Sequence, residues 1–186
     1  MAITDAIFKQ LRKNAEKVEV GDSKLRSKTA LIISAFAAVY SINVFLHNGL
    51  NNTVLNNTIK ANDLWAFYQA KSMKQTMAEY ALEAAQKNRD ADRVKELQAL
   101  VDRYESEPAT GEGKREIFAR AKALEAERDL AKKKSPWFGM AGSVMQIAIV
   151  LLTASMLTAG MLMFWGGIAA QAIALMLMSQ GLFLWF

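Results

Sequence analysis

The chain alternates between charged stretches and long stretches that carry no charge. Thr29–Ile59 and Ser135–Phe186 contain no Lys, Arg, Asp or Glu, so every charge lies in Met1–Lys28 or Lys60–Lys134. A transmembrane helix needs about 20 consecutive, mainly apolar residues. The first charge-free stretch therefore predicts one transmembrane helix over residues 29–47. The second is long enough for two crossings, so residues 135–186 predict a transmembrane helical hairpin.

The ends of the two closing helices are predicted from local signals. Ser135 is a suitable N-cap and Pro136 a suitable first helical residue, so we expect a new helix to begin there. The Gly pair in Phe164–Gly167 is the best dividing point within the charge-free stretch. We therefore expect one helix near Ala141–Met163 and another near Ile168–Phe183.

Residues 1–28 form an amphipathic N-terminal segment. Ile3, Ile7, Leu11 and Val18 fall near one helical stripe, with basic residues on the other faces. We expect this helix to end at Gly21–Ser23 and to lie on a membrane surface or on a neighbouring subunit.

Residues 48–134 have the composition of an extramembrane helical domain. An apolar stripe, with spacings of three and four residues over much of it as in helix hairpins and coiled coils, runs through Phe67, Ala70, Met77, Ala81 and Ala84. The two Asn-Asn-Thr triplets predict a polar, non-helical exit from the membrane, and the helix that follows starts in "LWAFYQAKS" (Leu64–Ser72). An unbroken helix over Asn62–Glu105 would span roughly 66 Å, and the return helix Lys114–Lys134 only roughly 30 Å.

This mismatch in length predicts a break in the domain at Lys87–Asp92, where Asn and Asp favour local side-chain bonding. The Pro and Gly of Ser106–Gly113 predict a second turn. We expect Ala91–Glu105 and Lys114–Lys134 to pair as an antiparallel hairpin. Asp63–Gln86 would then face the membrane or another subunit.

The charge balance bears on partners and topology. The net charge is +5, and no nucleic-acid motif accompanies it, so we expect contact with the lipid bilayer and not with nucleic acid. Lys24, Arg26 and Lys28 precede the first span. Basic residues favour the cytoplasmic side, which places the N-terminus in the cytoplasm and residues 48–134 outside.

The sequence predicts no catalytic, cofactor or metal site, and no enzyme activity. Cys is absent and His47 is the single histidine. The aromatic residues beside the charge-free stretches are expected to act as membrane-interface anchors: Trp65, Phe67, Tyr68, Trp137, Phe138 and Trp185. Uncharged polar residues within the spans either line a pore or connect helices: Ser41, Asn43, Gln146, Gln171 and Gln180.

Two segments resemble a known family. "NDLWAFYQAKSMKQ" (Asn62–Gln75) and "GSVMQIAIVLLTAS" (Gly142–Ser155) are similar to the bacterial membrane family known as domain of unknown function 4337. The resemblance implies a short tail, one membrane helix, a charged helical region and two closing membrane helices. It implies no chemistry, because the family has no established activity. Its specific residues are Asp63, Trp65, Tyr68, Gln69, Ala70, Lys71 and Lys74.

These observations together predict an all-α protein of the bacterial inner membrane, with three transmembrane helices and an extramembrane antiparallel helical hairpin. One short helix and a close pair make a thin bundle, so we expect a homo-oligomer. The expected role is structural or scaffolding, with the helical domain as the interaction element. The alternative is an oligomeric channel or an accessory subunit of a membrane complex.

Overall fold

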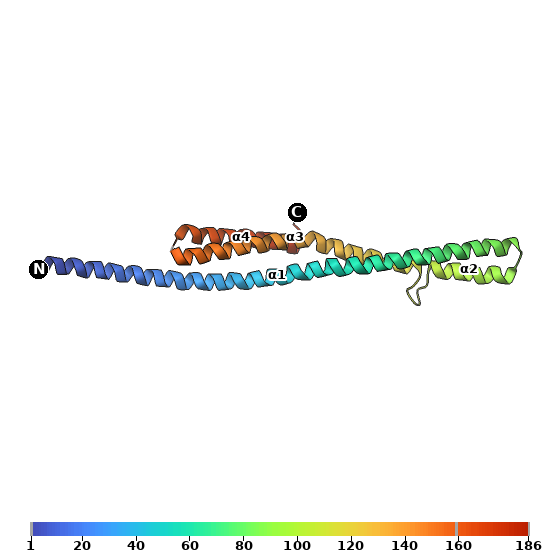
Figure 1. The fold of residues 1–186 in the computed structure, drawn as a ribbon, viewed down its shortest axis with the longest axis horizontal. Helices are drawn as coiled ribbons and strands as arrows, with labels where there is room; N and C mark the ends of the chain where they lie inside the picture. The colour runs from blue at the N-terminus through green and yellow to red at the C-terminus, as the bar shows by residue number, and fades with distance from the viewer. Residues whose placement is uncertain (1, 159, 186) are drawn as a thin grey trace. The chain divides into compact units, whose positions relative to one another are not determined.

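The computed structural model describes the backbone of residues 2–158 and 160–185, and the side chains of residues 26–157 and 160–185. The described chain is all-helical, with four helices: α1 (Ala2–Lys87), α2 (Ala91–Glu105), α3 (Lys114–Thr158) and α4 (Met161–Phe183) (Figure 1). Three of these helices are long and apolar enough to cross a membrane, namely α1, α3 and α4.

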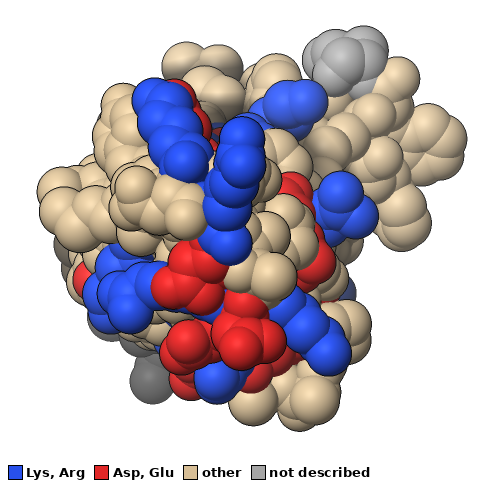
Figure 2. All heavy atoms as spheres, turned by 90° about the vertical axis from the view of Figure 1, so that its right-hand side faces the viewer, with Lys and Arg blue, Asp and Glu red and all other residues tan. Residues whose placement is uncertain are grey.

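The helices form two compact units. Met1–Gly49 and Lys134–Phe186 make up the first, here called the apolar unit, and Leu50–Lys133 make up the second, here called the charged unit. Helices α1 and α3 each contribute residues to both units. Figure 2 looks onto the end of the charged unit where α1 joins α2, and it shows Lys and Arg interspersed with Asp and Glu.

Helix α1 is longer than the sequence predicts. The expected end at Gly21–Ser23 is wrong, because α1 runs through these residues without interruption. A single Gly in a helix interior costs only about 1 kcal/mol relative to Ala, which a long helix tolerates. The predicted amphipathic stripe in residues 1–28 consists of Ile3, Ile7, Leu11 and Val18. All four precede residue 26, so their side chains lie outside the described residues.

The expected non-helical exit after the first span is also wrong. Helix α1 continues through both Asn-Asn-Thr triplets, so Trp65 lies in its interior and not near its start. The polar side chains make contacts that are compatible with a helix. Thr58 Oγ1 donates to the Val54 carbonyl at 2.6 Å, and Asn57 Nδ2 donates to Glu127 of α3 at 3.0 Å. The Asn57 side chain therefore joins α1 to α3 and does not form a local turn.

Helix α3 passes through the predicted start of the second span. Pro136 lies inside α3, so Ser135 is not an N-cap and the expected helix start there is wrong. Pro136 removes the N–H that would bond the carbonyl four residues earlier, but one missing bond need not end a helix whose neighbours supply other contacts. A contact with α1 is present at the preceding residue, where His47 Nδ1 lies 3.1 Å from the Ser135 carbonyl and can only act as the donor.

The division between the closing helices lies earlier than the Gly pair. Helix α3 ends at Thr158 and Gly160 is the N-cap of α4, so the expected division at Phe164–Gly167 is wrong. Gly167 is instead a packing residue within α4. A Cβ atom there would lie 2.7 Å from Leu152 Cγ of α3. The absence of a side chain therefore allows α3 and α4 to approach closely.

Both predicted turns of the charged unit are confirmed. Helix α1 ends at Lys87 and α2 begins at Ala91, and residues 106–113 connect α2 to α3. Asp90 caps α2, because its Oδ1 accepts a hydrogen bond from the Arg93 N–H at 3.1 Å. Asp therefore acts at this break through its side chain, as the sequence predicts.

The partner of α2 differs from the expected one. The three-residue connection joins α2 to the end of α1, and Gln75 of α1 bonds Glu105 at the other end of α2 (Figure 1). Helix α2 therefore lies antiparallel to the last turns of α1, and not against Lys114–Lys134. The first part of α3 lies beside an earlier part of α1, where Trp65 bonds Glu125. Leu50–Lys87 is about 57 Å long, enough to receive α2 and then α3.

The side of α1 that α2 and α3 cover is here called the inner face. Its positions are buried or half-buried and recur at alternating spacings of four and three residues. An average spacing of 3.5 keeps one stripe of a helix against its neighbours over many turns. The inner face consists of Leu50, Val54, Asn57, Ala61, Leu64, Tyr68, Lys71, Gln75, Ala78, Leu82 and Ala85.

Candidate functional site

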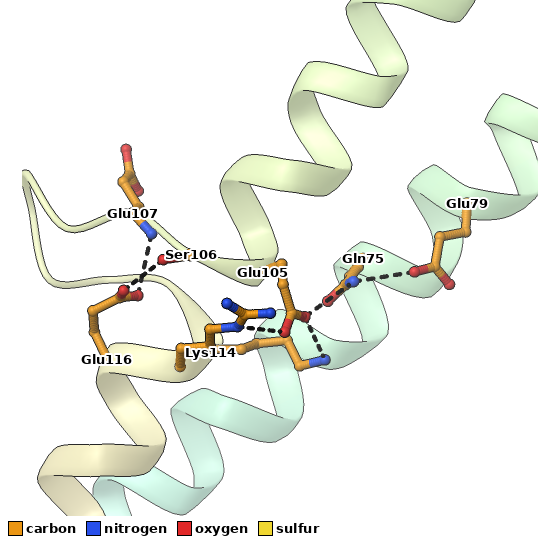
Figure 3. Close-up of polar contacts among 8 residues, drawn as sticks. Gln75, Glu79, Glu105, Ser106, Glu107, Lys114 and Glu116 are labelled. Atoms are coloured by element: carbon orange, nitrogen blue, oxygen red, sulfur yellow. Dashed lines mark hydrogen bonds and ion pairs between the residues drawn. The ribbon is translucent and has the colours of Figure 1, made fainter.

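Polar side chains from three helices meet at Glu105 in the charged unit (Figure 3). Its carboxylate accepts hydrogen bonds from Arg115 Nε at 3.2 Å, Lys114 Nζ at 3.5 Å and Gln75 Nε2 at 3.4 Å. Burial alone would raise the pKa of Glu105, but the Arg115 hydrogen bond and the Lys114 charge outweigh it and lower the pKa. The carboxylate therefore joins α1, α2 and α3 as an anion.

A second carboxylate holds the loop between α2 and α3. Glu116 accepts from Ser106 Oγ at 2.6 Å and from the Glu107 N–H at 3.1 Å (Figure 3). The Ser106 bond and then the Glu107 N–H lower the pKa of Glu116. Gly113 makes this arrangement possible, because a Cβ there would overlap the Glu116 carboxylate and lie 2.6 Å from Ser106 Cα.

Lys71 extends these contacts along α1. Its side chain is only 11% exposed and its ammonium lies 3.8 Å from the Glu112 carboxylate. The same ammonium lies 5.5 Å from the centre of the Tyr104 ring and 5.8 Å from that of Phe67. A cation over aromatic faces is stabilised by the ring quadrupole. Lys71 therefore connects α1 to α2 and to the loop.

Trp65 and Tyr68 are in contact with α3. Trp65 Nε1 donates to Glu125 Oε1 at 2.9 Å, and its ring lies edge-on to Phe118 with centroids 5.4 Å apart. The Lys114 ammonium lies 5.5 Å from the centre of the Tyr68 ring. Of the three aromatic residues expected here as membrane anchors, Phe67 is the exposed one, at 40%. The anchor role of this group stays a prediction.

The aromatic residues of the apolar unit differ in exposure. Phe138 is 2% exposed, and its ring would lie 2.7 Å from a Cβ at Gly181 of α4. Trp137 is half-buried, whereas Trp185 is 72% exposed. Phe138 therefore belongs to the packing between α3 and α4. Trp185 has the exposure that an interface anchor needs.

Uncharged polar groups connect α1 to α3 in the apolar unit. Asn43 is 1% exposed and its Nδ2 donates to the Phe138 carbonyl at 3.0 Å. Gly142 leaves room for this amide, because a Cβ there would lie 3.0 Å from Asn43 Nδ2. Gln146 Nε2 donates to the Tyr40 hydroxyl. These residues and their neighbours surround a small pocket of about 150 Å³.

The other polar residues of the spans lie in different environments. Gln180 is 2% exposed and its Oε1 accepts from the Trp185 N–H at 3.0 Å. Gln171 is 2% exposed, and neither end of its amide has a hydrogen-bond partner among the described residues. Ser41 is exposed and donates to the Ala37 carbonyl at 2.9 Å. Of the five residues, Asn43 and Gln146 thus connect helices by hydrogen bonds, and the choice between pore and helix contact stays a prediction.

The described residues contain no group of three or more His, Cys, Asp or Glu side chains that could hold a metal ion. A pocket of about 180 Å³ lies beside Tyr68 and Phe118, but Glu105, Lys114 and Arg115 in its wall already pair with one another. The expected absence of catalytic, cofactor and metal sites stays a prediction.

The sequence interpretation missed Glu105, Phe118 and the burial of Lys71. It placed the apolar stripe of this helix on Phe67, Ala70 and Met77, which are exposed. Lys71 and Gln75 are part of the inner face, so a search for apolar residues alone does not identify that face. A search for positions three and four residues apart, starting from Tyr68, would have identified it.

The fold and site define a class of protein: an all-helical chain in which helices apolar enough to cross a membrane also build a charged helical unit. A family model described as "Domain of unknown function (DUF4337)" matches residues 25–184, and the chain belongs to that family. The resemblance noted from Asn62–Gln75 and Gly142–Ser155 is thereby confirmed. Comparison with curated proteins and with solved structures finds no match.

The structure divides the residues that carry the resemblance between two sides of α1. Trp65, Tyr68 and Lys71 are buried or half-buried and contact α2, α3 or the loop between them. The remaining four are exposed: Asp63, Gln69, Ala70 and Lys74. The segment therefore presents one side to its own chain and another side to the surroundings.

Proposed function

We propose that the protein is a structural or scaffolding component of the bacterial inner membrane, anchored by its apolar unit and binding other protein through its charged unit. The observation that carries this proposal is that α1 and α3 each run as one helix from a charge-free span into the charged unit. Contacts of Glu105 with Gln75 of α1 and with Lys114 and Arg115 of α3 join the three helices of that unit. A fixed helical surface holds its side chains in one arrangement, as a binding surface requires.

The spacing of the inner face supports a more specific description of the charged unit. Alternating spacings of three and four residues are typical of coiled coils, in which each side chain of the stripe inserts between four side chains of the facing helix. We describe the charged unit as an intramolecular coiled coil of α1 with α2 and then α3. Lys71 and Gln75 occupy core positions of that coiled coil, where polar groups fix the register.

The proposed orientation places the N-terminus in the cytoplasm and residues 48–134 outside. It rests on Lys24, Arg26 and Lys28 before the first span. A single Thr110→Cys substitution tests it, because the chain has no other cysteine. We expect a membrane-impermeant maleimide to label this variant in intact cells. Labelling only after lysis would reverse the orientation.

Crosslinking in native membranes tests the scaffolding role. The charged unit is rich in lysine, so an amine-reactive crosslinker should convert the protein into a discrete complex of higher mass. The protein should also stay in the membrane pellet after carbonate extraction. A protein that runs as a lone monomer under these conditions, or that leaves the pellet, contradicts the proposal.

The alternative of an oligomeric channel has less support. Asn43, Gln171 and Gln180 are the most polar buried side chains of the apolar unit, and each is at most 2% exposed in the single chain. A lumen between copies would need such groups on the outer surface. A role as an accessory subunit of a membrane complex is compatible with the same charged unit.

A further inference from the structure

An apolar stripe on α1 is left uncovered by the rest of the chain. It is here called the outer face, and it includes Met73, Met77 and Tyr80, which are 63%, 66% and 68% exposed. Its positions recur at spacings of four, three, four, three and four residues, and none is charged. The outer face consists of Ala66, Ala70, Met73, Met77, Tyr80 and Ala84, all exposed.

The outer face has the same average spacing as the inner face but lies on the other side of the helix. The inner-face residues nearest to Met77 are Gln75 and Ala78, and both are buried. At 100° per residue, the outer-face positions fall roughly opposite the inner-face positions along the whole stripe. Helices α2 and α3 occupy the inner face, so they do not cover the outer face.

We propose that the outer face binds the outer face of a second copy of this chain, with the two α1 helices parallel and in register. The proposal rests on the proposed membrane anchoring. Two copies inserted the same way into one bilayer send their α1 helices out on the same side, which excludes antiparallel pairing between them. A 3.5-residue spacing winds two such helices around each other, with each stripe position meeting its equivalent.

The residues that flank the stripe agree with the parallel arrangement, because only the antiparallel one brings two like charges together. In a parallel pair, Lys74 lies beside the partner's Gln69, because flanking residues five positions apart meet across such a seam. An antiparallel pair centred on the stripe would instead place Lys74 beside the partner's Lys74. Like charges at that distance repel, so the flanking residues favour parallel pairing.

The side chains of the stripe suit close packing between copies. Ala66, Ala70 and Ala84 are small and allow the two backbones to approach. Met73 and Met77 are flexible and fill the remaining space. Apolar stripes that stay exposed in a single chain mark interaction surfaces.

Disulfide crosslinking of single-cysteine variants in native membranes tests the proposal. Ala70→Cys and Ala84→Cys lie towards the two ends of the stripe. In a parallel pair, equivalent positions of the seam bring the two Cα atoms to about 6 Å, within the range that a disulfide bridges. We expect both variants to form dimers on mild oxidation.

Glu79→Cys is the matched control, because Glu79 is exposed on the same helix only two residues from Met77 but off the stripe. We expect at least about fivefold more dimer from each stripe variant than from the control, because only the stripe positions meet the disulfide geometry. Equal dimer from stripe and control overturns the proposal. In an antiparallel pair centred on the stripe, Met73 would lie opposite the partner's Met77, so dimer that forms only when the Met73→Cys and Met77→Cys variants are co-expressed overturns the proposal too.

A bilayer surface is the competing occupant of the outer face. A fluorophore attached to Met77→Cys, in protein reconstituted into phospholipid vesicles, distinguishes a bilayer contact from a helix contact. Quenchers attached to lipid reach a label that lies on the bilayer but not one that lies between two helices. Strong quenching without disulfide dimer overturns the proposal. The double substitution of Met73→Glu with Met77→Glu should abolish the dimer and leave the helix content unchanged, because both side chains are exposed in the single chain.

The outcomes also separate this inference from the proposed function. A complex formed with amine-reactive crosslinker, but without preference for the stripe cysteines, contradicts the outer-face dimer and leaves the scaffold. Absence of any complex in both experiments contradicts both.

Discussion

The two units use the same two long helices but hold them together by different means. In the apolar unit, α1, α3 and α4 meet through glycines such as Gly142, Gly167 and Gly181 and through uncharged hydrogen bonds. In the charged unit, α1, α2 and α3 meet through carboxylates with Lys and Arg, and through Lys over aromatic rings. Among the described residues, the ion pairs all lie in the charged unit.

This difference follows if the apolar unit lies in lipid and the charged unit in water. Apolar side chains gain nothing by leaving lipid for each other, so helices there associate through small residues and interhelical hydrogen bonds. In water, apolar burial supplies the driving force, and charges on the rim of the contact select the partner. The predictions below test this contrast, beginning with the largest expected effect.

Gly167→Ala should destabilise the apolar unit by about 1–3 kcal/mol, the usual cost of forcing an extra carbon into a packed contact. Its Cβ would lie 2.7 Å from Leu152 Cγ and 3.1 Å from the Ala148 carbonyl oxygen, which belongs to the backbone. Thermal unfolding in detergent measures the loss. Gly166→Ala is the control, because its Cβ would meet Leu151 at an ordinary 3.8 Å. Equal melting temperatures for the two variants would contradict close glycine packing of α3 and α4.

Gly113→Ala should lower the free energy of unfolding of the charged unit by about 1–2 kcal/mol, because the loop must shift and one or both Glu116 hydrogen bonds are lost. The new Cβ would overlap the Glu116 carboxylate and the Glu107 nitrogen. Faster hydrogen exchange at the Glu107 amide, without change in the apolar unit, is the expected result. Gly49→Ala is the control, since a Cβ there meets nothing within 4 Å. Exchange that spreads through the apolar unit would show that the two units do not respond separately.

The comparison also explains which features the sequence could predict. Charge-free stretches and the turns at Lys87–Asp92 and Ser106–Gly113 depend on local composition, and both turns are confirmed. The Gly pair at Gly166 and Gly167 was misinterpreted, because a glycine that ends a helix and one that packs against another helix look alike in sequence. Which of the two applies depends on Leu152, which comes from another helix.

Polar residues on the inner face were missed for a related reason. Lys71 and Gln75 interrupt the apolar pattern, so the sequence favours the neighbouring stripe through Ala70 and Met77. Lys71 is buried because Tyr104 and Glu112, more than thirty residues later, surround its ammonium. Contacts of this kind depend on the tertiary fold, which local patterns do not encode.

Arg89→Gly should stabilise the charged unit by about 0.5–1 kcal/mol, since a non-glycine residue is strained in the left-handed region. Arg89 has a φ of 56° in the connection between α1 and α2. Urea unfolding of the charged unit measures the gain. Arg89→Ala removes the same side chain and keeps the strain, so it should show no gain. Stabilisation by both variants would assign the effect to the Arg side chain instead of the backbone.

Acid should loosen the charged unit before the apolar unit, and this is the smallest of the expected effects. The pKa of Glu116 is lowered by Ser106 and the Glu107 N–H, so its contribution is complete above the unfolded value of about 4.3 and is lost as pH falls through the lower folded value. The protection of the Glu107 amide, meaning its exchange rate relative to the intrinsic rate at the same pH, should therefore fall below about pH 4.

The control for the acid effect is Glu116→Gln, which keeps an acceptor but does not titrate. Its exchange at the Glu107 amide should be faster at neutral pH and should lose the part of the acid response that Glu116 causes. The apolar unit has no Asp or Glu among its described side chains, so the protection of its amides, corrected for the intrinsic rate, should not change over the same range. An acid response of equal size in both units would show that carboxylates outside the Glu105 and Glu116 contacts control the stability of the whole chain, and the contrast between the units would fail.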